Sequence, residues 1–108
     1  MLFYDPILSS DSSIACASCH QPFSAFSHLQ HPLSHGVARK LGNRNAPGLF
    51  NLAWSSSFMW DNGLPNVESV ALRAITNPME MNEKLETVLK KLNKNPVYKR
   101  KFKEVFSV

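Results

Sequence analysis

The sequence predicts a single all-α domain that carries one long irregular loop. Apolar residues recur at spacings of three and four in the segments 66–77, 82–94 and 95–106, which is the period of an amphipathic helix. No segment alternates apolar and polar residues for long enough to indicate a strand. At 108 residues the chain forms one domain, residues 1–108, and it holds no apolar run long enough to cross a membrane.

The first part of the chain predicts an extended lead-in, a short helix and then the loop. An Asp-Pro pair indicates a turn within residues 1–13. The polar residues 11–13 are candidate N-caps for a helix over Ala15–His20, which Pro22 ends. Residues 21–45 show no periodicity. A loop of this length is uncommon in a small domain, and a large cofactor would fill the space that it leaves.

The second part predicts a short helix, an aromatic corner and three longer helices. "NRNAPGLFNLAW" indicates a turn and a short helix with Pro47 near its first position, and "SSSFMWDNG" indicates the corner. Asn66, Asn82 and Asn95 are the candidate N-caps of the three helices. The side chains expected to face inward are Val67, Val70, Ala71, Ala74 and Ile75, then Leu85, Val88, Leu89 and Leu92, then Tyr98, Phe102, Val105 and Phe106.

The positive charge is concentrated near the C-terminus. The formal net charge is +4, and eight of the twelve Lys and Arg residues fall between Lys84 and Lys103. A basic patch can attract nucleic acid. These cations lie in segments with helical periodicity, where Lys and Arg usually line the solvated face, so we expect no nucleic-acid partner.

Both cysteines of the chain lie in the pentapeptide "CASCH". Cys-x-x-Cys-His is the spacing that attaches c-type haem. On one helical turn, Cys16 and Cys19 can add to the two vinyl groups of the porphyrin. The next residue, His20, then supplies the proximal iron ligand. The motif therefore predicts one covalent haem c.

Three other readings of these cysteines stay open at this point. Cys16, Cys19, His31 and His35 come within one residue of a zinc-finger spacing, although Pro32 makes a helix shared by the two histidines hard to form. A redox-active dithiol is a second reading. A structural disulfide is a third, but so short a closed loop adds little stability.

Longer blocks around the motif resemble the bacterial di-haem cytochrome c peroxidases, a group that includes relatives oxidising protein-bound amines. The blocks are "LFYDPILSSDSSIACASCHQPFSAFS", "HGVARKLGNRNAPGLFNLAW", "FMWDNG" and "ITNPMEM", and together they run from Leu2 to about Phe106. The resemblance implies a cytochrome c-like fold. It identifies the chain with the N-terminal, peroxidatic haem domain, without the second haem domain and without an export signal. It also implies a periplasmic full-length protein and, as one assembly, a homodimer of that protein.

The same resemblance implies roles for individual residues. His20 would be the proximal iron ligand, and His35 would be a removable sixth ligand of the iron. Glu80 matches the acidic residue over the distal haem face, and Trp60 matches the tryptophan between the two haems. Asn45 matches a contributor to a calcium site at the domain boundary.

The function implied is the reduction of hydrogen peroxide to water. Glu80 would accept and return the proton, and a small cytochrome or copper protein would supply electrons through the second haem domain. The alternative is a mono-haem c-type electron-transfer protein in which His35 or a methionine stays on the iron.

Several neighbouring residues have a simpler interpretation. His28 and His31 are expected to be solvated loop residues. Met79 and Met81 are expected to serve packing, because a methionine ligand raises the haem potential and suits electron transfer rather than peroxide activation. Val70 stands where many members of the family have a different residue, so the distal pocket is expected to differ in detail.

Overall fold

The computed structural model describes residues 1–107 and confirms the all-α prediction. In this part of the chain no strand forms, and extended pairing is limited to isolated bridges. The α-helices are α1 (Cys16–Cys19), α2 (Val67–Thr76), α3 (Leu85–Lys94) and α4 (Pro96–Phe106). The short 3-10 helices are η1 (Leu2–Tyr4), η2 (Pro6–Leu8), η3 (Pro22–Ser24), η4 (Val37–Arg39) and η5 (Leu52–Trp54).

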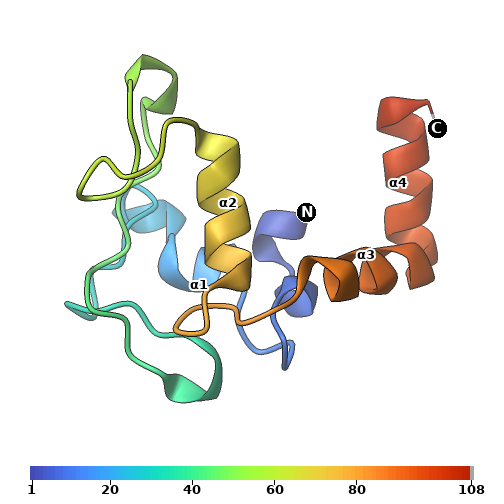
Figure 1. Cartoon of the computed structure of the whole chain (residues 1–108), viewed down its shortest axis with the longest axis horizontal. Coiled ribbons are helices and arrows are strands. Elements are labelled where there is room, and N and C mark those ends of the chain that lie inside the picture. Colours follow the sequence, from blue (N-terminus) through green and yellow to red (C-terminus); the bar gives the residue numbers. More distant parts are fainter. Residues whose placement is uncertain (108) are drawn as a thin grey trace.

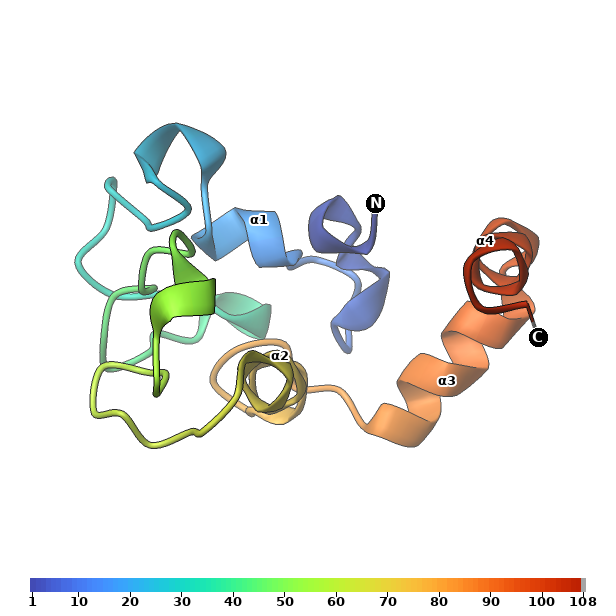
Figure 2. The same cartoon turned by 90° about the horizontal axis from the view of Figure 1, so that it is seen from above.

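The elements form a body with a helical arm. In Figure 1, α1, α2 and the N-terminal segment lie at the centre, and the residues between α1 and α2 make up one side of the molecule. Helix α3 leads away from this body on the other side, and α4 turns sharply from its end (Figure 2). None of the helices in residues 1–107 has both the length and the apolar character that a membrane span requires.

The extended lead-in predicted for residues 1–13 is wrong, because two 3-10 turns, η1 and η2, occupy its first half. The turn predicted at the Asp-Pro pair is confirmed. Asp5 caps η2 by accepting a hydrogen bond from the Ile7 amide at 2.9 Å. Pro6 occupies the first position of that turn, where its missing amide hydrogen costs nothing.

The N-cap predicted for α1 at residues 11–13 is also wrong. Asp11 accepts a hydrogen bond from the Ser13 amide at 3.0 Å, a local turn that competes with helix capping. Helix α1 instead begins after Ala15, whose amide donates to Ser18 Oγ at 3.0 Å. The serine within the motif therefore holds the start of the helix.

The short helix predicted at Pro47 does not form, and the helical turn of this region is η5, farther along the chain. The carbonyl of Ala46 would have accepted the first hydrogen bond of a helix beginning at Pro47. It accepts one from Ser27 Oγ instead, at 2.8 Å. The backbone before Pro47 is thus bonded to a distant segment, and no helix begins there.

Helix α2 begins and ends where the sequence predicts. Asn66 is its N-cap, with Oδ1 accepting from the Ser69 amide at 2.9 Å, and Asn77 is its C-cap. The buried face is narrower than predicted, and no side chain of α2 is completely buried. Val70, Ala74 and Ile75 are half-buried, whereas Val67 and Ala71 are exposed.

Helix α3 begins later than predicted. Its N-cap is Lys84, not Asn82. Asn82 has a left-handed backbone (φ 50°), and its amide donates to the Asn77 carbonyl at 3.0 Å, so it closes the preceding turn. Val88 is buried as predicted, whereas Leu85 and Leu89 are exposed.

Helix α4 is capped as predicted but is largely unburied. Asn95 Oδ1 accepts from the amides of Val97 and Tyr98, with Pro96 at the first position. Tyr98 is buried and its hydroxyl donates to Asp5 Oδ2 at 2.5 Å. The inward direction predicted for the rest of the stripe is wrong, because Phe102, Val105 and Phe106 are exposed.

The core joins the N-terminal segment to the turn after α2 and to α3. It consists of Leu8, Met81 and Val88, with Leu2, Ile7, Ile14, Ile75 and Leu92 packed around it. Lys91 ties the same parts together: Nζ donates to the carbonyls of Ile7 and Ser9 and pairs with Glu83 Oε2 at 2.7 Å. The turn that carries Glu80 is therefore anchored beside the N-terminus.

Candidate functional site

Helix α1 brings both thiols and His20 onto one turn. The His20 amide donates to the Cys16 carbonyl at 2.9 Å, which closes the turn. The thiols form no disulfide, so that reading is wrong. Burial raises the pKa of both the Cys16 and the Cys19 thiol, which favours the neutral form. A redox-active dithiol needs a thiol with a lowered pKa, so these two thiols do not favour the redox interpretation.

The ring of His20 is oriented by the loop that follows it. Its Nδ1 lies 2.8 Å from the Phe26 carbonyl oxygen. A carbonyl can only accept, so Nδ1 carries the hydrogen, and in the neutral form of the ring Nε2 is the nitrogen with the free lone pair. A neutral imidazole held in this way is the usual state of a histidine ligand to a metal.

Local pairing explains why the Phe26 carbonyl is available. The Gln21 amide donates to the Ser27 carbonyl at 3.0 Å, and the Phe26 amide donates back to Gln21 at 2.9 Å. Ala25 and Phe26 both take left-handed backbone angles, φ 51° and 58°, to close this small loop. Nothing in the sequence pattern indicated the Phe26 carbonyl as part of the site.

The segment around His35 lies against the turn that carries Glu80. The Val37 amide donates to the Glu80 carbonyl at 2.8 Å. A Cβ atom on Gly36 would collide with the carbonyl oxygens of Met79 and Glu80, so only glycine allows this approach. On the other side, Cys19 Sγ donates to the His35 carbonyl at 3.5 Å. Three predicted site segments, far apart in sequence, thus come together.

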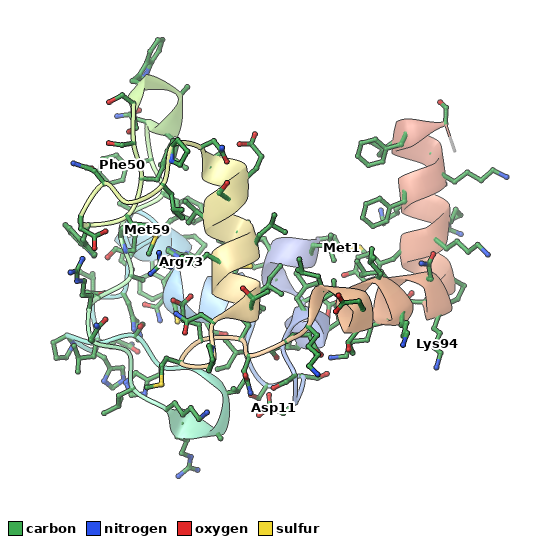
Figure 3. All side chains as sticks on the ribbon, viewed as in Figure 1. Met1, Asp11, Phe50, Met59, Arg73 and Lys94 are labelled. Atoms are coloured by element: carbon green, nitrogen blue, oxygen red, sulfur yellow. The ribbon has the colours of Figure 1, made fainter. Side chains whose placement is uncertain are left out.

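The Glu80 carboxyl is half-buried between these segments. Burial raises its pKa, while a hydrogen bond from Asn77 and the charge of Arg73 act in the opposite direction. Asn77 Nδ2 donates to Glu80 Oε1 at 2.8 Å. Figure 3 shows Arg73 on the side of α2 that faces the loop. A carboxyl with a raised pKa in such a position is suited to proton transfer.

Three histidine rings gather next to this region. The ring centroids of His31 and His35 are 4.5 Å apart, and those of His28 lie 5.1 Å from His31 and 6.2 Å from His35. His31 is exposed as predicted. The solvated position predicted for His28 is wrong: it is buried, and burial lowers its pKa, with smaller effects from the other two rings.

The zinc reading is not supported by the geometry. Among residues 1–107, no group of three or more His, Cys, Asp or Glu side chains is arranged to hold a metal ion. The four candidates, Cys16, Cys19, His31 and His35, therefore do not assemble as a zinc site. The histidines share no helix, because residues 31–35 lie in irregular structure.

Asn45 connects the loop to the aromatic corner. Trp60 Nε1 donates to the Asn45 carbonyl at 2.8 Å, and Asn45 Nδ2 donates to the His28 carbonyl at 2.9 Å. The remaining side-chain atom, Asn45 Oδ1, is buried without a hydrogen-bond partner. An oxygen of this kind is a ligand that calcium prefers. The Trp60 side chain itself is 61% exposed, so it is not a core residue.

An open apolar cleft of about 160 Å³ lies between the aromatic corner and α2. In Figure 3, Met59 and Phe50 mark the loop that forms one wall. The residues that line the cleft include Leu49, Leu52, Phe58, Met59, Trp60 and Val70.

The two methionines that flank Glu80 differ in environment. Met81 is buried in the core, which confirms its predicted packing role. Met79 is 44% exposed, so the packing role predicted for it is wrong. Its amide instead donates to Asn77 Oδ1 at 2.9 Å within the turn.

Comparison with known proteins places these observations in context. A family model described as di-haem cytochrome c peroxidase matches residues 1–107. The chain is 35% identical to the methylamine utilization protein MauG of Methylorubrum extorquens over 97% of its own length and 30% of that protein. It is 36% identical to the cytochrome c peroxidase Ccp of Escherichia coli, over 97% of this chain and 23% of that protein.

The fold agrees with a solved structure as well. A MauG-like protein associated with microbial copper homeostasis superposes with a TM-score of 0.86 at 27% identity. The match covers 98% of this chain and 32% of that one. The chain thus spans about a third or less of the length of the proteins that it matches.

Proposed function

Because this chain belongs to the di-haem cytochrome c peroxidase family, we propose that it forms the haem domain in which the protein reduces hydrogen peroxide to water. One observation carries the proposal. The His20 ring is held through Nδ1 by the Phe26 carbonyl, directly beside two thiols on the same helical turn. This is the arrangement that a covalent haem and its proximal ligand require.

The residues present fit the haem. Cys16 and Cys19 would hold it through thioether bonds, and His20 would offer Nε2 to the iron. When bound, the haem iron would supply the electrons that reduce peroxide.

Glu80 would handle the proton. Its Oε1 accepts the Asn77 hydrogen bond, so Oε2 is the oxygen free to take the proton from peroxide and return it to the departing oxygen. The raised pKa supports this role, since a buried carboxyl takes up a proton more readily. His35, whose backbone lies between Cys19 and Glu80, would occupy the sixth position at rest and leave on activation.

The finer parts of the proposal concern the whole protein. Electrons would come from a small cytochrome or copper protein through a second haem domain, and Trp60 would lie on that path. Asn45 Oδ1 would contribute one ligand to calcium at the domain boundary, which its lack of a partner supports. The full-length protein would be periplasmic, and a homodimer is the assembly to test first.

Mass spectrometry of matured, denatured protein tests the haem. The expected mass is that of the polypeptide plus one haem. A mass equal to the polypeptide alone, in material that passed through the haem-attachment machinery, would remove the central claim. Replacing Cys16 and Cys19 with alanine is the matched control and should give the bare polypeptide mass.

Peroxide reactivity tests the roles of His35 and Glu80. His35→Gly should keep the haem, give a five-coordinate ferric spectrum and react at once with peroxide. In that background Glu80→Gln should slow the reaction by about 10²- to 10⁴-fold, the usual contribution of acid–base catalysis. Glu86→Gln, exposed on α3, is the control and should have no effect. A low-spin spectrum in His35→Gly would favour the electron-carrier alternative.

A further inference from the structure

Glu80 is held by one neighbouring side chain. We infer that Asn77 is a positioning residue for the Glu80 carboxyl: its amide nitrogen fixes Oε1 and leaves Oε2 free for the substrate. The hydrogen bond from Asn77 Nδ2 to Glu80 Oε1 is 2.8 Å long. This inference rests on the proton-transfer role proposed for Glu80.

The two ends of the Asn77 side chain have separate tasks. Oδ1 accepts from the Met79 amide at 2.9 Å and stabilises the turn after α2. The main-chain carbonyl of Asn77 also stabilises this turn, because it accepts hydrogen bonds from the amides of Glu80 and Asn82, each at 3.0 Å. Turn formation needs only these acceptors, and an aspartate would supply them equally well. The Nδ2 donor is surplus to the turn, and Glu80 is its partner.

The surroundings of Glu80 show why a neutral donor matters. Burial favours the protonated carboxyl, whereas Asn77 and the Arg73 guanidinium on α2 favour the carboxylate. The Glu80 charge in turn contributes to the raised pKa of the Cys19 thiol on α1, after burial, the largest cause. Among residues 1–107, only Asn77 donates a hydrogen bond to the carboxyl, so it sets both the orientation of the carboxyl and part of its proton affinity.

Asn77→Asp separates the two tasks. It keeps the Oδ acceptor for the Met79 amide but removes the donor and adds a like charge beside Glu80. Asn66→Asp is the matched control, because it makes the same chemical change at the other end of α2. There the side chain is used as an acceptor only. Asn77→Ser is a second variant: its hydroxyl can accept in the turn without adding charge.

Two readouts on the matured haem protein test the inference. The first is the pH at which the infrared stretch of the ferrous carbon monoxide complex shifts, which reports proton binding near the haem independently of turnover. The second is the peroxide reaction rate in the His35→Gly background. In Asn77→Asp the midpoint should rise, and the pH below which the peroxide reaction slows should rise by the same number of pH units. Asn77→Ser should move both readouts in the same direction by less.

Glu80→Gln separates failure of this inference from failure of the proposed function. Suppose that the pH-dependent infrared shift disappears in Glu80→Gln, while both Asn77 variants keep the wild-type midpoint and peroxide reaction rate. Asn77 then serves only the turn, and the inference is wrong. If the midpoint persists in Glu80→Gln, Glu80 is not the proton carrier, and the proposed role and the inference both fail. Shifts in both Asn77 variants, with Asn66→Asp unchanged, support the inference.

Discussion

Replacing Lys91 with methionine should destabilise the protein far more than the same replacement at Lys90. Lys91 Nζ lies 2.7 Å from both Glu83 Oε2 and the Ser9 carbonyl, and 3.2 Å from the Ile7 carbonyl. Glu83 is 8% exposed, so methionine would leave a buried carboxylate without its ion-pair partner, with Oε1 still accepting from the Lys84 amide at 2.9 Å. Lys91→Met therefore removes the hydrogen bonds that join α3 to the N-terminal segment.

The size of the loss follows from the burial of the two partners. Breaking a buried ion pair by removing one member costs about 3–5 kcal/mol. The Lys91 side chain is 24% exposed, so solvent screens part of the interaction. The free energy of unfolding should therefore fall by about 2–4 kcal/mol. Lys90→Met, on an exposed position of the same helix, should change it by less than about 0.5 kcal/mol.

The pH dependence provides an internal check. The hydrogen bond from Lys91 lowers the pKa of Glu83 below its ordinary value of 4.5. A lowered pKa contributes stability above pH 4.5 that is lost as the pH falls through the folded-state value. Without Lys91, the largest cause that lowers the pKa of Glu83 is gone, while burial still raises it and the hydrogen bond from the Lys84 amide still lowers it. The difference between wild type and Lys91→Met should hence shrink as the pH falls below 4.5.

Urea unfolding of the matured protein at pH 7 and at pH 4, followed by circular dichroism, measures both effects. The double variant Lys91→Met/Glu83→Gln should recover part of the loss, because no buried charge remains. A loss equal to that of Lys90→Met, or one that does not change with pH, would show that the pair contributes nothing and that the argument from burial is wrong.

Three further outcomes are expected. Gly36→Ala should lower the free energy of unfolding by about 1–3 kcal/mol, since the added Cβ collides with the Met79 and Glu80 carbonyls. The control Gly63→Ala should be tolerated, because its Cβ meets only a side-chain oxygen at 3.3 Å. Equal losses for the two variants in urea unfolding would contradict this. Tyr98→Phe should cost about 1.5–3 kcal/mol by removing the hydrogen bond to a carboxylate. Burial and that bond raise the pKa of Tyr98 from 10.0 to about 12, so the wild type should lose stability between those pH values, and a variant with the same alkaline loss would refute the assignment. Asn45→Ala should weaken calcium binding about tenfold in calorimetry, the effect of losing roughly 1.4 kcal/mol, and unchanged binding would exclude Oδ1 as a ligand.

Local chemistry made part of this protein predictable from sequence. The Cys-x-x-Cys-His spacing places three functional groups on one helical turn whenever that segment is helical. Helix α1 confirms the predicted turn, with Cys16 and Cys19 in the helix and His20 at its C-cap. The caps at Asn66 and Asn95 are confirmed for the same reason, because a side chain bonds an amide two or three residues away. Interactions of this range depend only on the neighbouring residues.

Long-range pairing decided what the sequence could not. The carbonyl of Ala46 accepts a hydrogen bond from Ser27, and no helix begins at Pro47. His28 is buried, and the Asn45 side chain reaches its carbonyl across the loop. The apolar stripe of α4 predicted burial for Phe102, but a helical period states only which residues share a face, not whether another element covers that face.

The candidate site depends on both kinds of information. The sequence by itself determined which residues are candidates for the chemistry, since the thiols and His20 come from one motif and the resemblance of "ITNPMEM" to the family indicated Glu80. Only the tertiary structure decided that the Glu80 turn lies against Gly36, next to Cys19. The physical reason is that these contacts use the carbonyls of Glu80 and His35, and every residue carries a backbone carbonyl, so the sequence does not show which segments will meet.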